Sequence, residues 1–278
     1  LATLALFFAS MTLRALRWGL LFEEQCAFSS LFSAQMSGYL INNIAPARAG
    51  EVFRAHMLGI KERMSRTQVF STVIIERIAD LMIASMLLFG GGLISSSLPV
   101  ELRTAAAMLS LAATSALGGL IIIAALRQRR FLMQYWDWAV PAVLREKVFD
   151  LLYALSAGLL PLKDPGRLFR FMFLSCGIWA IELLYVGVIC ASVETLATFA
   201  QELSLLMFAV FGGLIPGPPA QAGVFEFAVS TGARVMSLEN GLALAIAWHV
   251  SFLVYSSVVG FLCIGPNAKH IFRLTAYE

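Results

Sequence analysis

The chain places ionisable side chains inside apolar stretches, where a charge must be paired or must serve a ligand. Arg14 and Arg17 lie three residues apart on one face of an apolar segment, and Glu76, Arg77 and Asp80 lie within another. Arginine suits phosphate because its planar guanidinium donates two parallel hydrogen bonds to phosphate oxygens. The same residues could instead form a buried ion-pair lattice with no ligand, and both interpretations stay open.

Two carboxylates and one guanidinium cannot neutralise one another, so the second segment predicts a cation from elsewhere in the chain. The candidates for this cation are Arg14, Arg17, Arg48 and Arg54. We interpret Glu182 and His249, single polar groups in later apolar stretches, as structural. The residues predicted to bind a substrate headgroup are Arg14, Arg17, Asn43, Arg48, Glu51, Arg54, Glu76, Arg77, Asp80 and Glu226. No residue is predicted to be catalytic or to bind a metal.

Two interruptions of the apolar pattern share a motif and lie beside several of these charges. Pro-Ala-x-Ala-Gly, followed closely by Val-Phe, begins at Pro46 and again at Pro219. Unwound backbone is tolerated at membrane depth only beside protein or a water-filled cavity, and paired broken segments indicate a transport site. We expect free N–H groups near Gly50 and Gly223 to form anion sites. The predicted break residues are Pro46, Gly50, Pro216, Pro219 and Gly223.

The composition places these features in a membrane protein. Of 278 residues, 59% are hydrophobic and 13% are charged, with a mean hydropathy of +0.82. A soluble domain carries roughly 25% charged residues. The four cysteines lack metal or redox spacing, so we interpret them as small apolar residues. Because the chain begins at Leu1 rather than Met, we expect some N-terminal sequence to be missing.

The apolar stretches predict an all-α, polytopic fold with about five full spans and two re-entrant helix pairs, each span needing about 20 mostly apolar residues. The predicted spans are residues 1–22, 69–94, 105–126, 168–190 and 241–264. Two further stretches, near residues 31–58 and 204–236, are too short or too broken to cross simply. We expect each of these two to enter and leave the membrane on the same side.

Charge asymmetry predicts the orientation. Lysine and arginine concentrate before residue 69, between residues 127 and 170, and after residue 264. This pattern places those segments and the C-terminus in the cytoplasm of a multi-pass cell-membrane protein. A span, a broken pair and a span then occur twice in opposite directions, which is an inverted repeat. We expect one transmembrane domain, residues 1–278, with halves at 1–126 and 168–278 and an interfacial amphipathic connector at 127–167.

Three motifs resemble those of one known family. They read Arg-Ala-Leu-Arg-Trp from Arg14, Asn-x-x-Pro-x-Arg-x-Gly-Glu-x-x-Arg from Asn43, and Glu-Arg-x-x-Asp from Glu76. In this order they resemble the transmembrane domain of lysylphosphatidylglycerol synthases, a family that also includes stand-alone flippase-like proteins of bacteria and archaea. The proline-rich break before Glu226 is similar to a late motif of the family, although residues 218–220 depart from it.

This resemblance implies movement of a lipid between leaflets. In the synthases the lipid is an aminoacylated phosphatidylglycerol made by a soluble C-terminal domain. Because this chain ends at Glu278, soon after its last predicted span, we expect no aminoacyl transfer from it. The leading hypothesis is a flippase for an anionic phospholipid, glycolipid or polyprenyl-linked lipid, with no cofactor and no nucleic-acid partner. Its partners would be membrane lipids and, as further candidates, lipid-biosynthesis enzymes.

Two other classes of function stay open. One is a membrane enzyme acting on lipid phosphates, which would need a nucleophile or a metal cluster that the sequence does not spell out as a motif. The other is a non-transporting subunit of a lipid or envelope biosynthesis complex, in which small-residue patches would pack against a partner.

Overall fold

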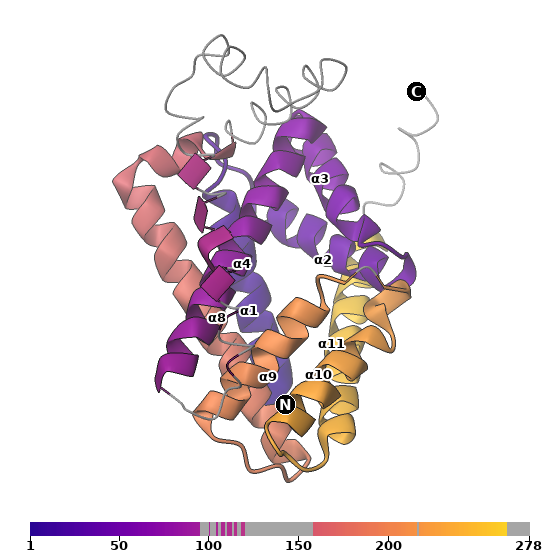
Figure 1. Ribbon diagram of the computed structural model, residues 1–278. Coiled ribbons are helices and arrows are strands. Elements are labelled where there is room, and N and C mark those ends of the chain that lie inside the picture. The colour runs from indigo at the N-terminus through magenta and orange to yellow at the C-terminus, as the bar shows by residue number, and fades with distance from the viewer. Residues whose placement is uncertain are drawn as a thin grey trace, which may run out of the picture.

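The computed structural model describes residues 1–94, scattered positions between 100 and 119, residues 158–215 and residues 217–265. Every regular element in these ranges is a helix, so the predicted all-α class is confirmed for them. Figure 1 shows the helices gathered in one bundle. Much of the predicted span at 105–126, most of the connector at 127–167, Pro216 and the C-terminal segment lie outside the described residues.

The first broken segment is a hairpin of α2 (Phe28–Ile44) and α3 (Ala49–Lys61). The helix α2 ends at Ile44, and Ala45 after it is extended because the proline that follows disfavours a helical conformation in the residue before it. Gly50 allows the two helices to pack closely, since a Cβ atom at this position would overlap the backbone of α2. The sequence of the break therefore sets both where the helices stop and how near they lie.

The second broken segment is a hairpin of α9 (Phe199–Gly212) and α10 (Val224–Val235), joined through the short 3-10 helix η2 (Pro219–Gln221). A capping box begins α9: the Gln201 N–H donates to the Thr198 hydroxyl, and the Thr198 N–H donates to the side-chain oxygen of Gln201. Proline in the connecting segment, which has no N–H to donate, keeps α9 from continuing into α10.

The two breaks share a local backbone conformation as well as a motif. Ala47 and Arg48 both have φ 56°, and Ala220 and Gln221, at the equivalent motif positions, have φ 55° and 57°. Each left-handed residue of this kind costs about 1–3 kcal/mol and persists only where its surroundings require it. The repeated Pro-Ala-x-Ala-Gly sequence is therefore matched by a repeated turn.

The hairpins enter the bundle from opposite ends (Figure 1). At the open end of the first, Lys61 Nζ donates to Ser33 Oγ at 2.6 Å. At the open end of the second, Gln201 Nε2 donates to the Met236 carbonyl at 3.1 Å. The breaks thus point toward each other inside the molecule. An inverted repeat of complete halves stays a prediction.

Two helices, α8 (Pro165–Ser192) and α11 (Gly241–Ile264), are long and apolar enough to cross a membrane, among the residues described. Over an apolar window of 18 residues in each helix, the mean hydropathies are 2.0 and 1.8. Large apolar side chains on their outer faces are exposed. Phe173 and Phe261, for example, are 69% and 71% exposed. Such a surface suits contact with lipid chains rather than water. The count of five spans stays a prediction.

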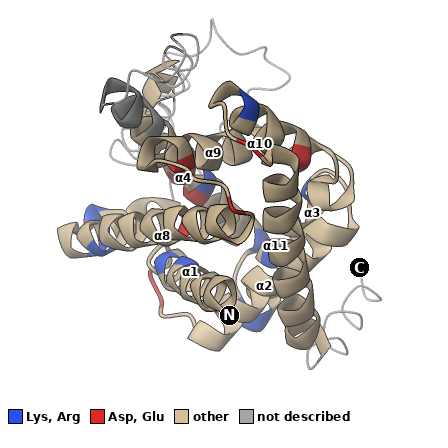
Figure 2. Cartoon of the chain, turned by 90° about the horizontal axis from the view of Figure 1, so that it is seen from below, with Lys and Arg blue, Asp and Glu red and all other residues tan. Residues whose placement is uncertain are grey.

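The helices α1 (Ala2–Gly19) and α4 (Arg66–Ile94) are also mostly apolar, but α1 carries charges near its C-terminal end and α4 carries charges near its middle. Figure 2 shows coloured, charged stretches of both helices lying among otherwise tan elements. Trp18 on α1 is fully buried and donates from Nε1 to Thr72 Oγ1 on α4 at 2.8 Å. These two helices therefore bring their charged faces together in the interior.

Candidate functional site

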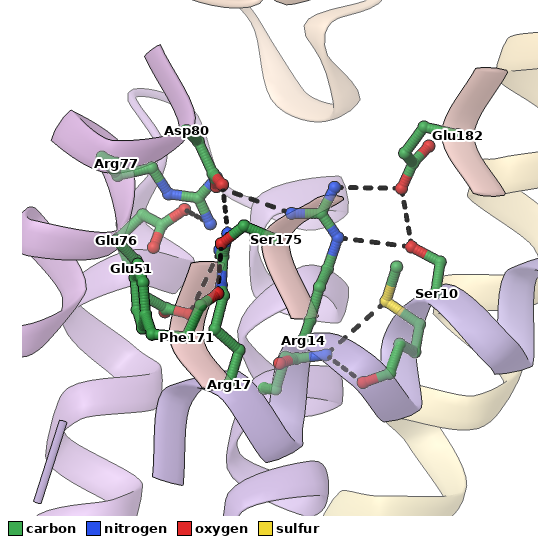
Figure 3. A network of polar contacts seen from close by, with 12 residues as sticks. Ser10, Arg14, Arg17, Glu51, Glu76, Arg77, Asp80, Phe171, Ser175 and Glu182 are labelled. Carbon is green, nitrogen blue, oxygen red and sulfur yellow. Dashed lines mark hydrogen bonds and ion pairs between the residues drawn. The ribbon is translucent and has the colours of Figure 1, made fainter. Parts of the chain in front are cut away.

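A closed ring of alternating charges lies between α1, α3 and α4. Figure 3 shows the part of it that is formed by Arg17, Glu51, Glu76, Arg77 and Asp80. Its members, in order around the ring, are Asp80, Arg17, Glu76, Arg54, Glu51 and Arg77, and Arg77 closes on Asp80. The six ion-pair distances range from 2.6 Å to 3.8 Å. Arg17, Glu76 and Arg54 are almost entirely buried, at 1%, 2% and 4% exposed. Each buried charge is thus paired on both sides.

A branch extends the ring to α8. Arg14 Nη2 lies 2.9 Å from Glu182 Oε1, and Arg14 Nη1 lies 3.6 Å from Asp80 Oδ2. Ser10 Oγ donates to the same Glu182 oxygen at 2.7 Å. The complete network holds four arginines and four carboxylates, so its formal charges cancel. The sequence predicted one further cation for Glu76 and Asp80, and the structure supplies three, Arg14, Arg17 and Arg54. Glu51 and Glu182 balance the two that are in excess.

Two of these arginines also lie over aromatic rings. The Arg54 guanidinium lies 4.9 Å from the centre of the Trp18 ring, and that of Arg17 lies 5.4 Å from the Phe171 ring. Cation–π contacts of this kind further stabilise a desolvated guanidinium. For Arg17, Arg54 and Glu76 the contacts favour the structural interpretation, since none of the three reaches the cavity described next.

A cavity of about 610 Å³ lies between the two hairpins and α4. This size is typical of a site for a small molecule or for the polar end of a larger one. Its polar lining consists of Arg14, Tyr39, Asn42, Asn43, Arg48, Glu51, Arg77, Asp80, Glu182, Gln221 and His249. Across the described residues no group of three or more His, Cys, Asp and Glu side chains could hold a metal ion.

Arg48 is the exception among the arginines of this cavity. It forms no ion pair with any acid in the described part of the chain. Its guanidinium instead donates to the carbonyl oxygen of Gly213, at the end of α9. Gln221 Nε2 donates to the same oxygen at 2.9 Å. The two breaks therefore meet at one carbonyl, and Arg48 brings an unbalanced positive charge to the cavity.

The N–H groups of Gly50 and Gly223 are themselves occupied by side chains, whereas anion sites elsewhere at the starts of these helices stay a prediction. The Gly50 N–H donates to Asn42 Oδ1 at 2.8 Å. The Gly223 N–H donates to Glu226 Oε2, also at 2.8 Å. A side chain next to each break thus satisfies one N–H group at the start of the following helix, as capping residues usually do. Neither glycine offers its N–H to an anion.

Glu226 lies outside the cavity lining, but its partner lies within it. His249 on α11 has Nδ1 at 2.6 Å from Glu226 Oε1 and Nε2 at 2.8 Å from the Ala220 carbonyl oxygen. The Phe225 ring lies 4.8 Å from the imidazole, centre to centre. This pair connects the first turn of α10, the second break and α11.

The remaining predicted residues hold the breaks in shape. Asn43 Nδ2 donates to the hydroxyls of Ser256 and Ser257 on α11, at 3.0 Å and 2.9 Å, and also lines the cavity. The break residues Pro46, Gly50, Pro219 and Gly223 do not line it, whereas Gly217 and Pro218 do. Prolines and glycines here shape the backbone.

Sequence reasoning missed several polar and aromatic residues of the lining. They are Tyr39, Asn42, Trp179, Gln221 and Trp248, and Glu182 and His249 were noticed but interpreted as purely structural. The last two carried the clearest signal, because an isolated ionisable group in a long apolar helix is rare. For Tyr39 and the tryptophans no signal was available, since aromatic residues are common in any membrane helix.

Comparison with known proteins adds a family to this geometry. The sequence profile of the lysylphosphatidylglycerol synthase transmembrane region matches residues 1–260. The chain belongs to this family. The family is a membrane domain often linked to lipid flippase function, so the chain is a membrane protein. No curated protein and no solved structure matches it significantly.

Proposed function

We propose that this chain moves an anionic lipid between the leaflets of the cell membrane, with the lipid headgroup bound in the cavity against Arg48. The observation that carries the proposal is the charge balance. The other four arginines of the site are neutralised by four carboxylates, whereas Arg48 faces the cavity with no acidic partner among the described residues. A cavity with one surplus guanidinium attracts a phosphate-bearing headgroup.

The lining of the cavity is both apolar and polar, which suits an amphiphile. Apolar side chains come from α4 and α9, with Phe70, Ile74, Ile78, Leu206 and Val210 among them. Polar side chains come from the two breaks and from α1, α4 and α8. Acyl or prenyl carbon atoms would contact the apolar side chains and the headgroup the polar ones, because apolar surface is stabilised out of water and buried polar groups need hydrogen-bond partners.

The arrangement of the hairpins supports movement rather than storage. In many transporters the substrate site lies where two broken helical elements meet, and rocking of one element exposes the site to alternate sides. Here Arg48 from the first break and Gln221 from the second share the Gly213 carbonyl. Under this proposal the chain performs no covalent step, needs no cofactor and has its C-terminus in the cytoplasm.

The test uses the full chain reconstituted in phosphatidylcholine vesicles that contain a trace of fluorescent phosphatidylglycerol. Dithionite added outside reports how fast the labelled lipid crosses. We expect transfer well above that of protein-free vesicles, and a fall of about tenfold or more for Arg48→Gln, since a hydrogen bond to a charged group contributes about 1.5–3 kcal/mol. Arg234→Gln, at an exposed position on α10, is the matched control.

Three results would count against the proposal. Transfer no faster than in empty vesicles would remove the activity itself. Equal rates of transfer by Arg48→Gln and Arg234→Gln would refute the role of Arg48 in binding the headgroup. Equal rates for fluorescent phosphatidylcholine and phosphatidylglycerol in the wild type would remove the preference for an anionic headgroup.

A further inference from the structure

The contacts of His249 and Glu226 require a proton that neither residue has in its ordinary neutral-pH form. The Ala220 carbonyl oxygen can only accept a hydrogen bond, so His249 Nε2, at 2.8 Å from it, must carry a hydrogen. A neutral imidazole then has its lone pair on Nδ1, which lies 2.6 Å from Glu226 Oε1. A lone pair facing a carboxylate oxygen at this distance is repulsive. One more proton, on either residue, makes both contacts favourable.

The second oxygen of Glu226 restricts the alternatives further. Glu226 Oε2 accepts from the Gly223 N–H at 2.8 Å, so this carboxylate is fixed by the turn that begins α10. The other neutral tautomer of the imidazole, with its hydrogen on Nδ1, does not help, because Nε2 would then face the Ala220 carbonyl oxygen without a hydrogen. The pair therefore makes all three contacts only when it holds the extra proton, and it is formally neutral in that state.

No other described acid or base forms an ion pair with this pair. The titratable and charged groups that share the cavity with His249 are Arg14, Tyr39, Arg48, Glu51, Arg77, Asp80 and Glu182. Each acid among them already pairs with an arginine. Glu202 and Arg234 lie in the first turn of α9 and the last turn of α10, at the open end of the second hairpin, away from Glu226 in the first turn of α10.

We propose that Glu226 and His249 form a proton-binding site that is coupled to anion binding at Arg48, an inference that rests on the proposed function. The coupling path is short. His249 holds Ala220, and the next residue, Gln221, shares the Gly213 carbonyl with Arg48. Loss of the proton breaks one contact of the imidazole and loosens the strained turn at Ala220 and Gln221, both of which are left-handed.

The electrostatic effect of the proton favours anion binding at Arg48 in the same way as the chain of contacts does. With the proton bound, the pair is neutral and the cavity keeps the surplus charge of Arg48. Without it, the pair carries one negative charge and the surplus disappears. Proton binding therefore favours anion binding, and by reciprocity the anion favours proton uptake. Coupling of this kind between two sites is worth about 5- to 150-fold in affinity, and we expect on the order of tenfold.

The discriminating variant is Glu226→Gln. A glutamine in this place can accept from the Gly223 N–H with its oxygen and donate to His249 Nδ1 with its amide nitrogen. All three contacts then exist without an extra proton, so the variant imitates the protonated pair. A residue that only supported the fold would give no such result. His56→Gln, on α3 and outside the cavity, is the matched control for removal of a histidine elsewhere.

The binding experiment titrates purified full-length chain with dihexanoyl phosphatidylglycerol by calorimetry, in two buffers of different ionisation enthalpy. For the wild type we expect affinity to fall about tenfold between about pH 5 and pH 9, the range in which histidine titrates, with proton uptake on binding. For Glu226→Gln we expect the wild-type low-pH affinity at every pH and no proton uptake. His56→Gln should behave as the wild type.

Several outcomes overturn the coupling. These are a wild-type affinity that is independent of pH, a Glu226→Gln affinity with the wild-type pH dependence, or a uniform loss of affinity in that variant at every pH. If the affinity of the wild type were independent of pH but Arg48→Gln still lowered lipid transfer, the proposed function would stand without the coupling. Absence of phosphatidylglycerol binding at every pH would instead refute the proposed function and the coupling together.

A second measurement tests the proton site without any lipid. The chain has three histidines, so nitrogen-15 spectra can be assigned by comparison with His249→Gln. Read together, the His249 ring nitrogens and the Glu226 carboxyl carbon should show the extra proton at about pH 5 and its release by about pH 9. A neutral ring beside an ionised carboxylate at about pH 5, or an extra proton still bound at about pH 9, would overturn the site.

Discussion

The ion ring predicts a large and non-additive cost when one of its buried members is removed. Glu76 and Arg54 form the clearest pair, at 3.1 Å, with side chains only 3% and 5% exposed. At an effective dielectric constant of about 20, two unit charges at this distance attract by about 5 kcal/mol, much of which offsets the cost of their desolvation. Removing one partner leaves the other buried and unbalanced, which costs about 3–5 kcal/mol.

We therefore expect Glu76→Gln and Arg54→Met each to lower the free energy of unfolding by about 3–5 kcal/mol. The double variant should cost no more than about one single variant, because it restores the neutrality of the network. The coupling energy, which is the cost of the double variant minus the summed costs of the two single variants, would then be about 3–5 kcal/mol in magnitude. Methionine is the chosen substitute because it keeps apolar contact with Trp18, over which Arg54 now lies.

The measurement is reversible unfolding of the full chain in mixed micelles by titration with dodecyl sulfate, followed by tryptophan fluorescence. Arg77→Gln is a useful comparison, because this side chain is 36% exposed and solvent screening should hold its cost to about 1 kcal/mol or less. Additivity of the two single variants to within about 0.5 kcal/mol would refute the closed ring. Single variants as stable as the wild type would refute the burial of the pair.

Two further predictions concern how the helices pack. Gly50→Ala should cost about 3 kcal/mol or more in the same unfolding assay, because its methyl group would overlap the Gly38 carbonyl, while Gly166→Ala, with only a side chain nearby, should stay close to the wild type. A small effect at Gly50 would mean that α2 and α3 lie further apart. Trp18→Phe should cost about 1 kcal/mol through the lost hydrogen bond to Thr72, and an unchanged stability would contradict that contact.

The sequence alone was sufficient for the class of the molecule. An apolar composition with few charges requires a membrane, and proline followed by glycine must interrupt a helix. Both Pro-Ala-x-Ala-Gly motifs lie where one helix of a pair gives way to the next, with left-handed residues at the same two motif positions. Local rules of this kind can be read from sequence because they involve residues that are close along the chain.

The number of spans shows where such reading weakens. The apolar pattern predicted spans over both α1 and α4, although α1 carries Arg14 and Arg17 and α4 carries Glu76, Arg77 and Asp80. Their charges are tolerated in the interior only because each helix supplies the counter-ions of the other. A property shared between two helices is invisible in either one taken singly.

Only the tertiary structure decided which charge meets which. Helical periodicity predicted that Arg14 and Arg17 share a face, but not that Glu182, far along the chain, would balance Arg14. The candidate cations looked equivalent in sequence, yet Arg48 alone among them forms no ion pair in the described chain. Pairing depends on how distant helices face one another, because a buried charge is stabilised by whatever lies within a few ångströms, whatever its place in the sequence.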